Sequence, residues 1–247
     1  MTEYLLLLIG GMAAGFINTL ASSGSAITLP IFLFLDFAPH VANATNRLNV
    51  LAASCASAVA FARQGKIDWA HVPHLLAPSV TGAILGAMLA DWLPDRELNR
   101  VIILAVIMSL ILVLAGANRF LRSAAQAQRT FGPLQMGLLL LVGIWAGLIV
   151  LDSYTYLLLT LVLAVGYDLV GANALKTVAG IGFCVAALVW FAGRAEVAWM
   201  AGGLMSLGSI VGAWLGAQLA ASERSKVWVF RVLVITILGE IAHLLWR

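Results

Sequence analysis

The chain has 247 residues, of which 62% are hydrophobic and only 10% are charged. Soluble domains carry about 25% charged residues, so this composition excludes an ordinary water-soluble domain and indicates a protein of the lipid bilayer. The net charge of +3 is small and no basic stripe with interleaved aromatic residues is present, which excludes a nucleic-acid partner.

Apolar segments alternate with polar breaks along the chain. Five precede a polar linker and five follow it: 4–20, 26–37, 41–62, 72–92 and 98–117, then 134–150, 153–166, 170–192, 198–220 and 228–246. Three in each half have the length of about 20 residues that crosses a bilayer, whereas the first two in each half are shorter and interrupted. The sequence therefore predicts an all-α polytopic membrane protein with a first repeat at 1–117, a cytoplasmic linker at 118–133 and a second repeat at 134–247.

The two halves match each other at a constant sequence separation, which equals that between Asn43 and Asn173. We call this separation the repeat offset. The matches keep other unusual residues in register: Trp69 with Trp199, Gly82 with Gly212 and Gly86 with Gly216. Upstream, Gly11 and Gly15 match Gly143 and Gly147 after a shift of two residues. Internal duplication with interrupted helices is typical of secondary transporters, and glycines four residues apart predict close helix packing.

Loop charge favours inverted halves over parallel ones. Arg63 and Lys66 make one loop basic, whereas its counterpart at 194–196 is neutral. The bias reverses for a second pair of loops, since 91–100 is net acidic and 223–231 is net basic. Because cytoplasmic loops are rich in Lys and Arg, we expect inverted repeats with the basic loops in the cytoplasm, each repeat having an interrupted or re-entrant hairpin plus three transmembrane helices. Eight crossings in parallel halves are the alternative.

A run of small polar residues, Ser22, Ser23, Gly24 and Ser25, interrupts the first hairpin. If a helix begins here at mid-membrane depth, its free backbone N–H groups and about half a positive charge attract an anion. The serine hydroxyls add donors, so we interpret these four residues as substrate-binding. The alternative is an ordinary turn outside the membrane in which serine caps a helix.

The third segment of each half carries polar residues in its first turns. Asn43, Asn46 and Arg47 recur at helical spacing and share a face. The guanidinium fork suits an oxyanion, and the corresponding face of the second half has Asn173 and Lys176. We expect all five to bind an anionic substrate. The alternative is that the two cations extend to the bilayer surface.

The second hairpin has a different break, which begins Asp152-Ser153-Tyr154. We expect Ser153 and Tyr154 to bind substrate. Asp152 is the predicted proton-coupling or counter-ion residue, because a buried acid either takes up a proton or pairs with a cation. Motifs for metal, nucleotide or nucleophilic chemistry are missing from the sequence, so we expect no cofactor, no metal and no enzymatic activity.

Four stretches carry a resemblance to a known family. They are the opening with Gly11, Ala14, Gly15 and Phe16, A-T-N-R-L-N-V-L at 44–51, A-F-A-R-Q-G-K-I-D-W at 60–69, and A-N-A-L-K at 172–176. The chain resembles the TauE/SafE family of sulfite and organosulfur anion exporters over nearly its whole length. The resemblance implies about eight membrane spans in two related halves and a substrate such as sulfite, sulfoacetate or another small sulfonate.

We therefore expect a multi-pass protein of the cell inner membrane that exports small sulfur-containing or organic oxyanions by alternating access. Its expected partners are the anionic substrate, the lipid bilayer and, if Asp152 couples transport, protons. A passive anion channel is the alternative function. The identity of the anion, the coupling ion, the direction of transport and the oligomeric state stay open.

Overall fold

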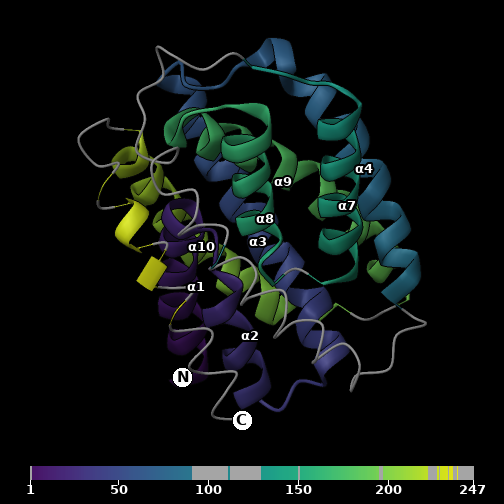
Figure 1. Ribbon diagram of the computed structural model, residues 1–247. Coiled ribbons are helices and arrows are strands. Elements are labelled where there is room, and N and C mark those ends of the chain that lie inside the picture. The colour runs from purple at the N-terminus through teal and green to yellow at the C-terminus, as the bar shows by residue number, and fades with distance from the viewer. Residues whose placement is uncertain are drawn as a thin grey trace.

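The computed structural model describes residues 2–90, 111, 129–149, 151–194, 197–221, 227, 229–232, 234, 235 and 238. Its helices are α1 (Thr2–Ala21), α2 (Ser25–Phe34), α3 (Pro39–Arg63), the 3₁₀ helix η1 (Trp69–His71), α4 (Val72–Leu89), α7 (Pro133–Leu148), α8 (Ser153–Leu159), the π-helix η4 (Thr160–Val165), α9 (Leu169–Ala192) and α10 (Trp199–Ala220). These residues include no strand, which confirms the all-α prediction (Figure 1). Most of the predicted segments 98–117 and 228–246, the first part of the linker and the loop at 91–100 lie outside the described residues.

Four spans in the described part of the chain are long and apolar enough to cross a bilayer: α1, η1 with α4, α9 and α10. The first segment was expected at 4–20 as the shorter arm of an interrupted hairpin, whereas α1 has 20 residues and is long enough to cross a bilayer. α3 is long enough with 25 residues, yet its first turns carry several buried polar and charged side chains. Those side chains lower its hydropathy and mark it as a helix that packs inside the protein.

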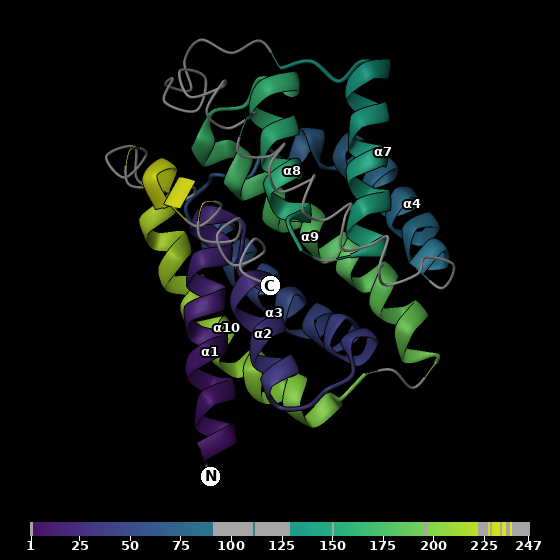
Figure 2. The same ribbon diagram turned by 60° about the horizontal axis from the view of Figure 1, so that its bottom comes forward.

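Two helix pairs form opposite sides of the molecule. α1 lies along α10, and α4 lies along α7, in both views (Figure 1 and Figure 2). A Cβ atom added to Gly15 would overlap the backbone of Ser209, and one added to Gly143 would overlap the backbone of Ser79. Because glycine has no side chain, the helix backbones approach closely, which confirms the predicted packing role of the glycines.

The two pairs share one register, which differs from the sequence match by a helical turn. Ser209 follows Ser79 by the repeat offset, and these two serines contact Gly15 and Gly143 respectively. Gly15 is thus equivalent to Gly143, and the predicted match with Gly147 is wrong by one turn. A glycine at every fourth residue offers a similar surface after each turn, so sequence similarity does not distinguish neighbouring turns.

α3 and α9 lie between the two pairs and contact each other (Figure 2). Arg47, near the start of α3, lies against the ring of Phe191, near the end of α9. Further along α3, Ser54 lies against Gly180, which is earlier in α9. These two helices occupy equivalent places in the two halves and run in opposite directions.

Each half breaks at an equivalent residue with left-handed backbone conformation. Ser22 has φ 67°, and Asp152, which follows it by the repeat offset, has φ 61°. Residues other than glycine rarely adopt this conformation, and serine does so at a cost. The chain continues as α2 after the first break and as α8 and η4 after the second. The predicted interruptions are therefore present in both halves.

Candidate functional site

The first hairpin tip, Ser22–Ser25, lies inside the protein. Ser22, Ser23 and Ser25 expose 3%, 0% and 4% of their surface. A Cβ atom at Gly24 would overlap the carbonyl of Ala14 in α1, so a residue without a side chain lets the tip fold back on its own helix. The backbone N–H of Gly24 donates to the Asn18 side chain at 3.4 Å. This tip is thus held against α1 and is shielded from solvent.

Lys176 of α9 reaches across to this tip. Its ammonium group donates to Ser22 Oγ at 2.9 Å and to Asn173 Oδ1 at 2.8 Å. The carbonyl oxygens of Asn18 and Thr19 lie at 3.1 and 3.2 Å from the same nitrogen. All four acceptors are neutral. Lys176 is also completely buried, so its charge is far from bulk water.

Tyr154 brings the second hairpin tip to the same ammonium group. Its ring centroid lies 6.0 Å from Lys176 Nζ, at the outer limit of a cation–π contact. The Tyr154 hydroxyl lies 2.5 Å from Ser54 Oγ of α3. Tyr154 exposes 2% of its surface. Lys176 therefore contacts both tips. The sequence match between the halves shows that the tips are equivalent, but it does not show that they lie close together.

Arg47 lies in the corresponding turn of α3, one residue out of register with Lys176 at the repeat offset, and binds the end of α7. Its two terminal nitrogens donate to the carbonyls of Ala146 and Gly147, each at 2.7 Å. The guanidinium carbon lies 4.8 Å from the centroid of the Phe191 ring. Arg47 exposes none of its surface. The structure thus excludes the alternative in which Arg47 and Lys176 extend to the bilayer surface.

The two cations satisfy the broken helices of opposite halves. The last four carbonyls of a helix have no partner within the helix and carry partial negative charge. Arg47, from the first half, binds two such carbonyls of α7. Lys176, from the second half, binds two of α1. Each interrupted helix therefore ends on a cation supplied by the other half.

Asn46 fastens the start of α2 to α3. It donates through Nδ2 to Ser25 Oγ at 2.9 Å, and its Oδ1 accepts from Thr28 Oγ1 at 2.5 Å. Asn49 Nδ2 also donates to this oxygen, at 3.4 Å. Asn43 is half-buried, and its Oδ1 has no hydrogen-bond partner among the described residues. Asn46 thus positions the tip, and the Asn43 side-chain oxygen is left available to accept a hydrogen bond.

Three further polar atoms, two at the tips and one in α9, are buried without a hydrogen-bond partner in the described part of the chain: Ser23 Oγ, Thr155 Oγ1 and Asn173 Nδ2. Asn173 gives its oxygen to Lys176, so the amide that remains can only donate. Buried polar groups are normally satisfied. These atoms therefore offer hydroxyl and amide donors to a bound group.

Asp152 and Ser153 lie at the second break. Asp152 exposes 2% of its surface and Ser153 exposes none. Asp152 directly precedes α8, so the carboxylate is buried at the hairpin tip. No group of three or more His, Cys, Asp or Glu side chains that could hold a metal ion occurs within the described ranges.

Sequence reasoning missed two contributors to these contacts. Asn18 accepts from Lys176 through its carbonyl and from Gly24 through its side chain. Ser54 binds the Tyr154 hydroxyl from the middle of α3. Both lie in apolar segments, where a single Ser or Asn is unremarkable. The only available signal was that polar residues at membrane depth are costly.

Nearly the whole chain is similar to known membrane transporter proteins. The sequence profile of the family described as "Sulfite exporter TauE/SafE" matches residues 7–242. The "Probable membrane transporter protein ORF9" of Sinorhizobium sp is 28% identical over 222 residues, which cover 90% of this chain and 84% of that protein. The "Probable membrane transporter protein YfcA" of Escherichia coli strain K12 is 25% identical over 219 residues, covering 87% and 80%. No solved structure matches the chain.

These matches agree with the apolar helices and the interrupted hairpins described above. The relatives are named as membrane transporters, and the chain covers most of their length. The protein is therefore a multi-pass membrane transporter. By the match over residues 7–242, the chain belongs to the TauE/SafE family of sulfite exporters.

Proposed function

We propose that the protein is a secondary transporter that exports small sulfur-containing or organic oxyanions, such as sulfite or sulfonates, by alternating access. The observation that carries the proposal is the position of Lys176, whose ammonium group contacts Ser22 of one hairpin tip and Tyr154 of the other. Its hydrogen-bond acceptors there are neutral. A buried ion costs several kcal/mol to desolvate, and an anion bound beside it offsets that cost.

The polar groups beside Lys176 suit an oxyanion. Asn173 contacts Lys176, and Ser23 and Thr155 directly follow its contacts Ser22 and Tyr154 in the chain. Ser23 Oγ, Thr155 Oγ1 and Asn173 Nδ2 can all donate, and none has a partner in the described residues. A sulfite or sulfonate group presents three oxygens, each of which accepts hydrogen bonds. Donors from both tips together with one cation therefore match the charge and the hydrogen-bonding needs of that group.

The two cations have different roles in this proposal. The terminal nitrogens of Arg47 are bonded to carbonyls of α7 at 2.7 Å, which makes Arg47 a positioning residue for the second break. Lys176 faces both tips and is the residue that contacts the anion. Its bonds to the carbonyls of Asn18 and Thr19 are longer, at 3.1 and 3.2 Å, so an anion displaces them more easily.

Alternating access is supported by the directions of the helices. α3 and α9 are equivalent by sequence, contact each other and run in opposite directions, as expected of inverted repeats. The proposed site lies between the tips of two interrupted hairpins, which is where such transporters bind substrate. We place the protein in the inner membrane with the 63–71 loop in the cytoplasm, and we assign Asp152 to proton coupling.

The test is uptake of radiolabelled sulfite into proteoliposomes, with sulfoacetate, isethionate, acetate and sulfate as competitors. Lys176→Met is expected to raise the half-saturation concentration at least tenfold, which corresponds to about 1.4 kcal/mol. Lys176→Arg keeps the charge and is expected to retain part of the affinity. Lys66→Met removes a positive charge from an exposed position and serves as the matched control.

Three results would contradict the proposal. An unchanged half-saturation concentration in Lys176→Met would show that the ammonium group does not bind the substrate. Uptake that is not accelerated by unlabelled anion preloaded inside the vesicles would indicate a passive channel, because counterflow requires a carrier. Competition by acetate but by none of the sulfur oxyanions would assign another substrate class.

A further inference from the structure

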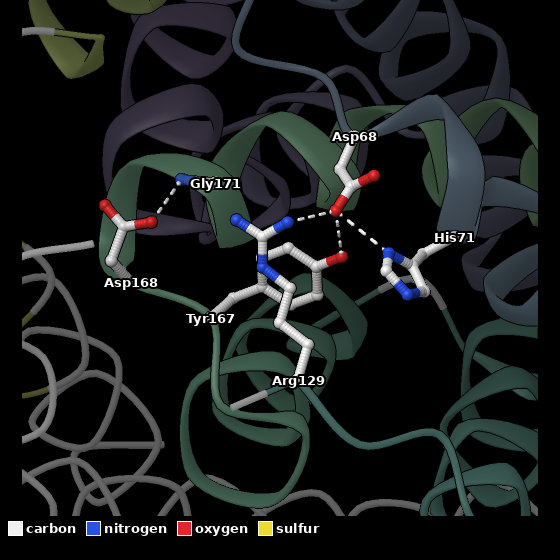
Figure 3. A network of polar contacts seen from close by, with 6 residues as sticks. All are labelled: Asp68, His71, Arg129, Tyr167, Asp168 and Gly171. Carbon is white, nitrogen blue, oxygen red and sulfur yellow. Dashed lines mark hydrogen bonds and ion pairs between the residues drawn. The ribbon is translucent and has the colours of Figure 1, made fainter. Parts of the chain in front are cut away.

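Asp68 gathers three donors at one end of the molecule. It lies in the connection between α3 and η1, and its Oδ2 accepts from Tyr167 Oη at 2.8 Å and is 2.9 Å from His71 Nδ1. Arg129 donates to the same oxygen and forms an ion pair with it (Figure 3). One carboxylate oxygen therefore joins residues that are 61 and 99 positions apart in the chain.

The residues of this cluster come from the first half, the linker and the second half of the protein. Asp68 and His71 are in the first half. Arg129 precedes α7, and Tyr167 connects η4 to α9. Figure 3 shows the Arg129 and Tyr167 side chains converging on the carboxylate, Arg129 from the linker before α7 and Tyr167 from the connection before α9. The Asp68 contacts therefore bind the α3–α4 connection of one half to the entry of two helices of the other.

Aromatic and backbone contacts reinforce this junction. The Phe131 ring stacks on His71 with centroids 5.0 Å apart and an interplanar angle of 13°. The Arg129 guanidinium lies 4.7 Å from the centroid of the Tyr167 ring. Beside them, Thr130 N–H donates to the Val165 carbonyl at 3.0 Å. The segment that leads into α7 is thus held on both sides of Thr130.

The opposite end of α3 has a different junction. At the repeat offset, Asp68 corresponds to Ala198 and Tyr167 to Phe37. Neither replacement carries a charge or a hydroxyl. Ala198 N–H donates to Thr45 Oγ1 at 2.9 Å, which links α3 to the start of α10. An ion-paired junction at one end therefore corresponds to a neutral hydrogen bond at the other.

We propose that Asp68 is a latch, a positioning residue that keeps its face of the transporter closed until transport separates it from Arg129 and Tyr167. Lys176 lies about two turns into α9, whose entry Tyr167 supplies. The Asp68 contacts and the proposed site therefore lie about two helical turns apart along α9. The junction at Asp68 has an ion pair and the one at Ala198 has only a neutral hydrogen bond. This difference favours the conformation in which the side of the transporter that carries Asp68, the Asp68 face, is closed. This inference rests on the proposed alternating access.

The test measures from which side the first tip is reached. Cys55 and Cys184 are replaced by Ser, and Ser23→Cys introduces a single thiol at the buried tip. A membrane-impermeant maleimide is applied to sealed vesicles of both orientations. In the parent protein we expect faster labelling from the face opposite Asp68. In Asp68→Asn and in Tyr167→Phe we expect labelling from the Asp68 face to rise several-fold and labelling from the opposite face to fall.

The matched control is Asp168→Asn, which removes a neighbouring carboxylate from the same face. Asp168 accepts from the backbone N–H groups of Val170 and Gly171 as the N-cap of α9, and asparagine caps a helix equally well. This variant is expected to keep the labelling ratio of the parent. Asp68→Glu retains the carboxylate and is expected to restore part of that ratio.

The outcomes separate the latch from the proposed function. If labelling from each face is unchanged in Asp68→Asn and Tyr167→Phe, while the parent labels from one face faster, alternating access stands and the latch is wrong. If the parent labels equally fast from both faces, the tip lies in an open pore. Alternating access then fails, and the latch fails with it. A uniform rise from both faces in the variants reflects loosened structure and also overturns the latch.

Discussion

Lys176 Nζ lies 2.9 Å from Ser22 Oγ, although the two residues are 154 positions apart and belong to different halves of the protein. Ser22 has the left-handed backbone conformation at the break, and Lys176 caps the helix that ends there. One contact thus joins the strained backbone of the first hairpin to the buried charge of the second half. The proposed binding site is built around this contact.

Substitutions at Ser22 separate backbone strain from the contact to Lys176. Both Ser22→Ala and Ser22→Gly lose a hydrogen bond to a charged group, which stabilises by about 1.5–3 kcal/mol. Glycine adopts φ near 67° freely and regains about 1 kcal/mol. We expect the Ala variant to melt at a lower temperature than the Gly variant in detergent, and both to transport with a raised half-saturation concentration. Equal melting temperatures would show that Ser22 is unstrained.

Substitutions at Arg47 are expected to affect folding more than substrate affinity. Arg47→Met leaves two buried carbonyls of α7 without their donors, at a cost of about 1–3 kcal/mol for each. Arg47→Lys keeps the charge and one of the two bonds, so it should recover part of the stability. The half-saturation concentration of the Lys variant is expected to stay near that of the parent. A tenfold increase without loss of melting temperature would instead make Arg47 a substrate ligand.

The close packing of α1 on α10 and of α7 on α4 can be tested by equivalent glycine substitutions in the two halves. Gly15→Ala and Gly143→Ala place a Cβ atom in the backbone of the partner helix, and overpacking of this kind costs about 1–3 kcal/mol. Gly203→Ala in α10 is the control, because its Cβ would have no neighbour within 4 Å. Thermal unfolding should show a similar loss for the first two variants and no loss for the control. A neutral effect at Gly15 would mean that α1 and α10 pack more loosely.

Acid should weaken the contacts of Asp68. Partial burial raises the pKa of this carboxyl group, but hydrogen bonds from His71 and Tyr167 and the charges of His71 and Arg129 outweigh it and lower the pKa. The stabilisation is therefore present above the ordinary pKa near 4 and is lost as the pH falls through the lower pKa of the folded protein. The melting temperatures of the parent and of Asp68→Asn should converge between about pH 5 and pH 2. A constant difference over this range would contradict the assignment.

The helical breaks were predictable because their chemistry is local. Small polar residues within an apolar run disfavour an uninterrupted helix, and Ser22 and Asp152 both stand where the structure breaks. The repeat offset likewise placed Asn43 and Asn173 in equivalent helices. These features depend on neighbouring residues or on similarity along the chain.

The partners of the buried cations were not predictable from spacing. A helical period shows that Asn173 and Lys176 share a face, which the 2.8 Å contact between them bears out. It does not show which backbone carbonyls that face meets. The acceptors in α1 and α7 are ordinary peptide groups, which every residue possesses, so the sequence carries no mark of them.

The junction at Asp68 was missed for a related reason. Asp68 was visible as one acid within the 60–69 motif, but Arg129 and Tyr167 lie 61 and 99 residues further along the chain. Charge counting treated the loop as basic and solvated. The side chain of Asp68 is in fact only 19% exposed and is enclosed by its donors. Long-range pairing of this kind depends on how α4, α7 and α9 come together.

The reciprocal capping of α1 and α7 has a consequence for biosynthesis. Lys176 follows Asn18 by 158 residues, so a ribosome adding about 5–20 residues per second needs roughly 8–30 seconds to supply it. During that interval the carboxyl end of α1 lacks the ammonium group that binds its carbonyls, and it is open to chaperones and membrane proteases. A polypeptide truncated before α9 never closes this end. Two separately expressed halves would become stable only after they had found each other.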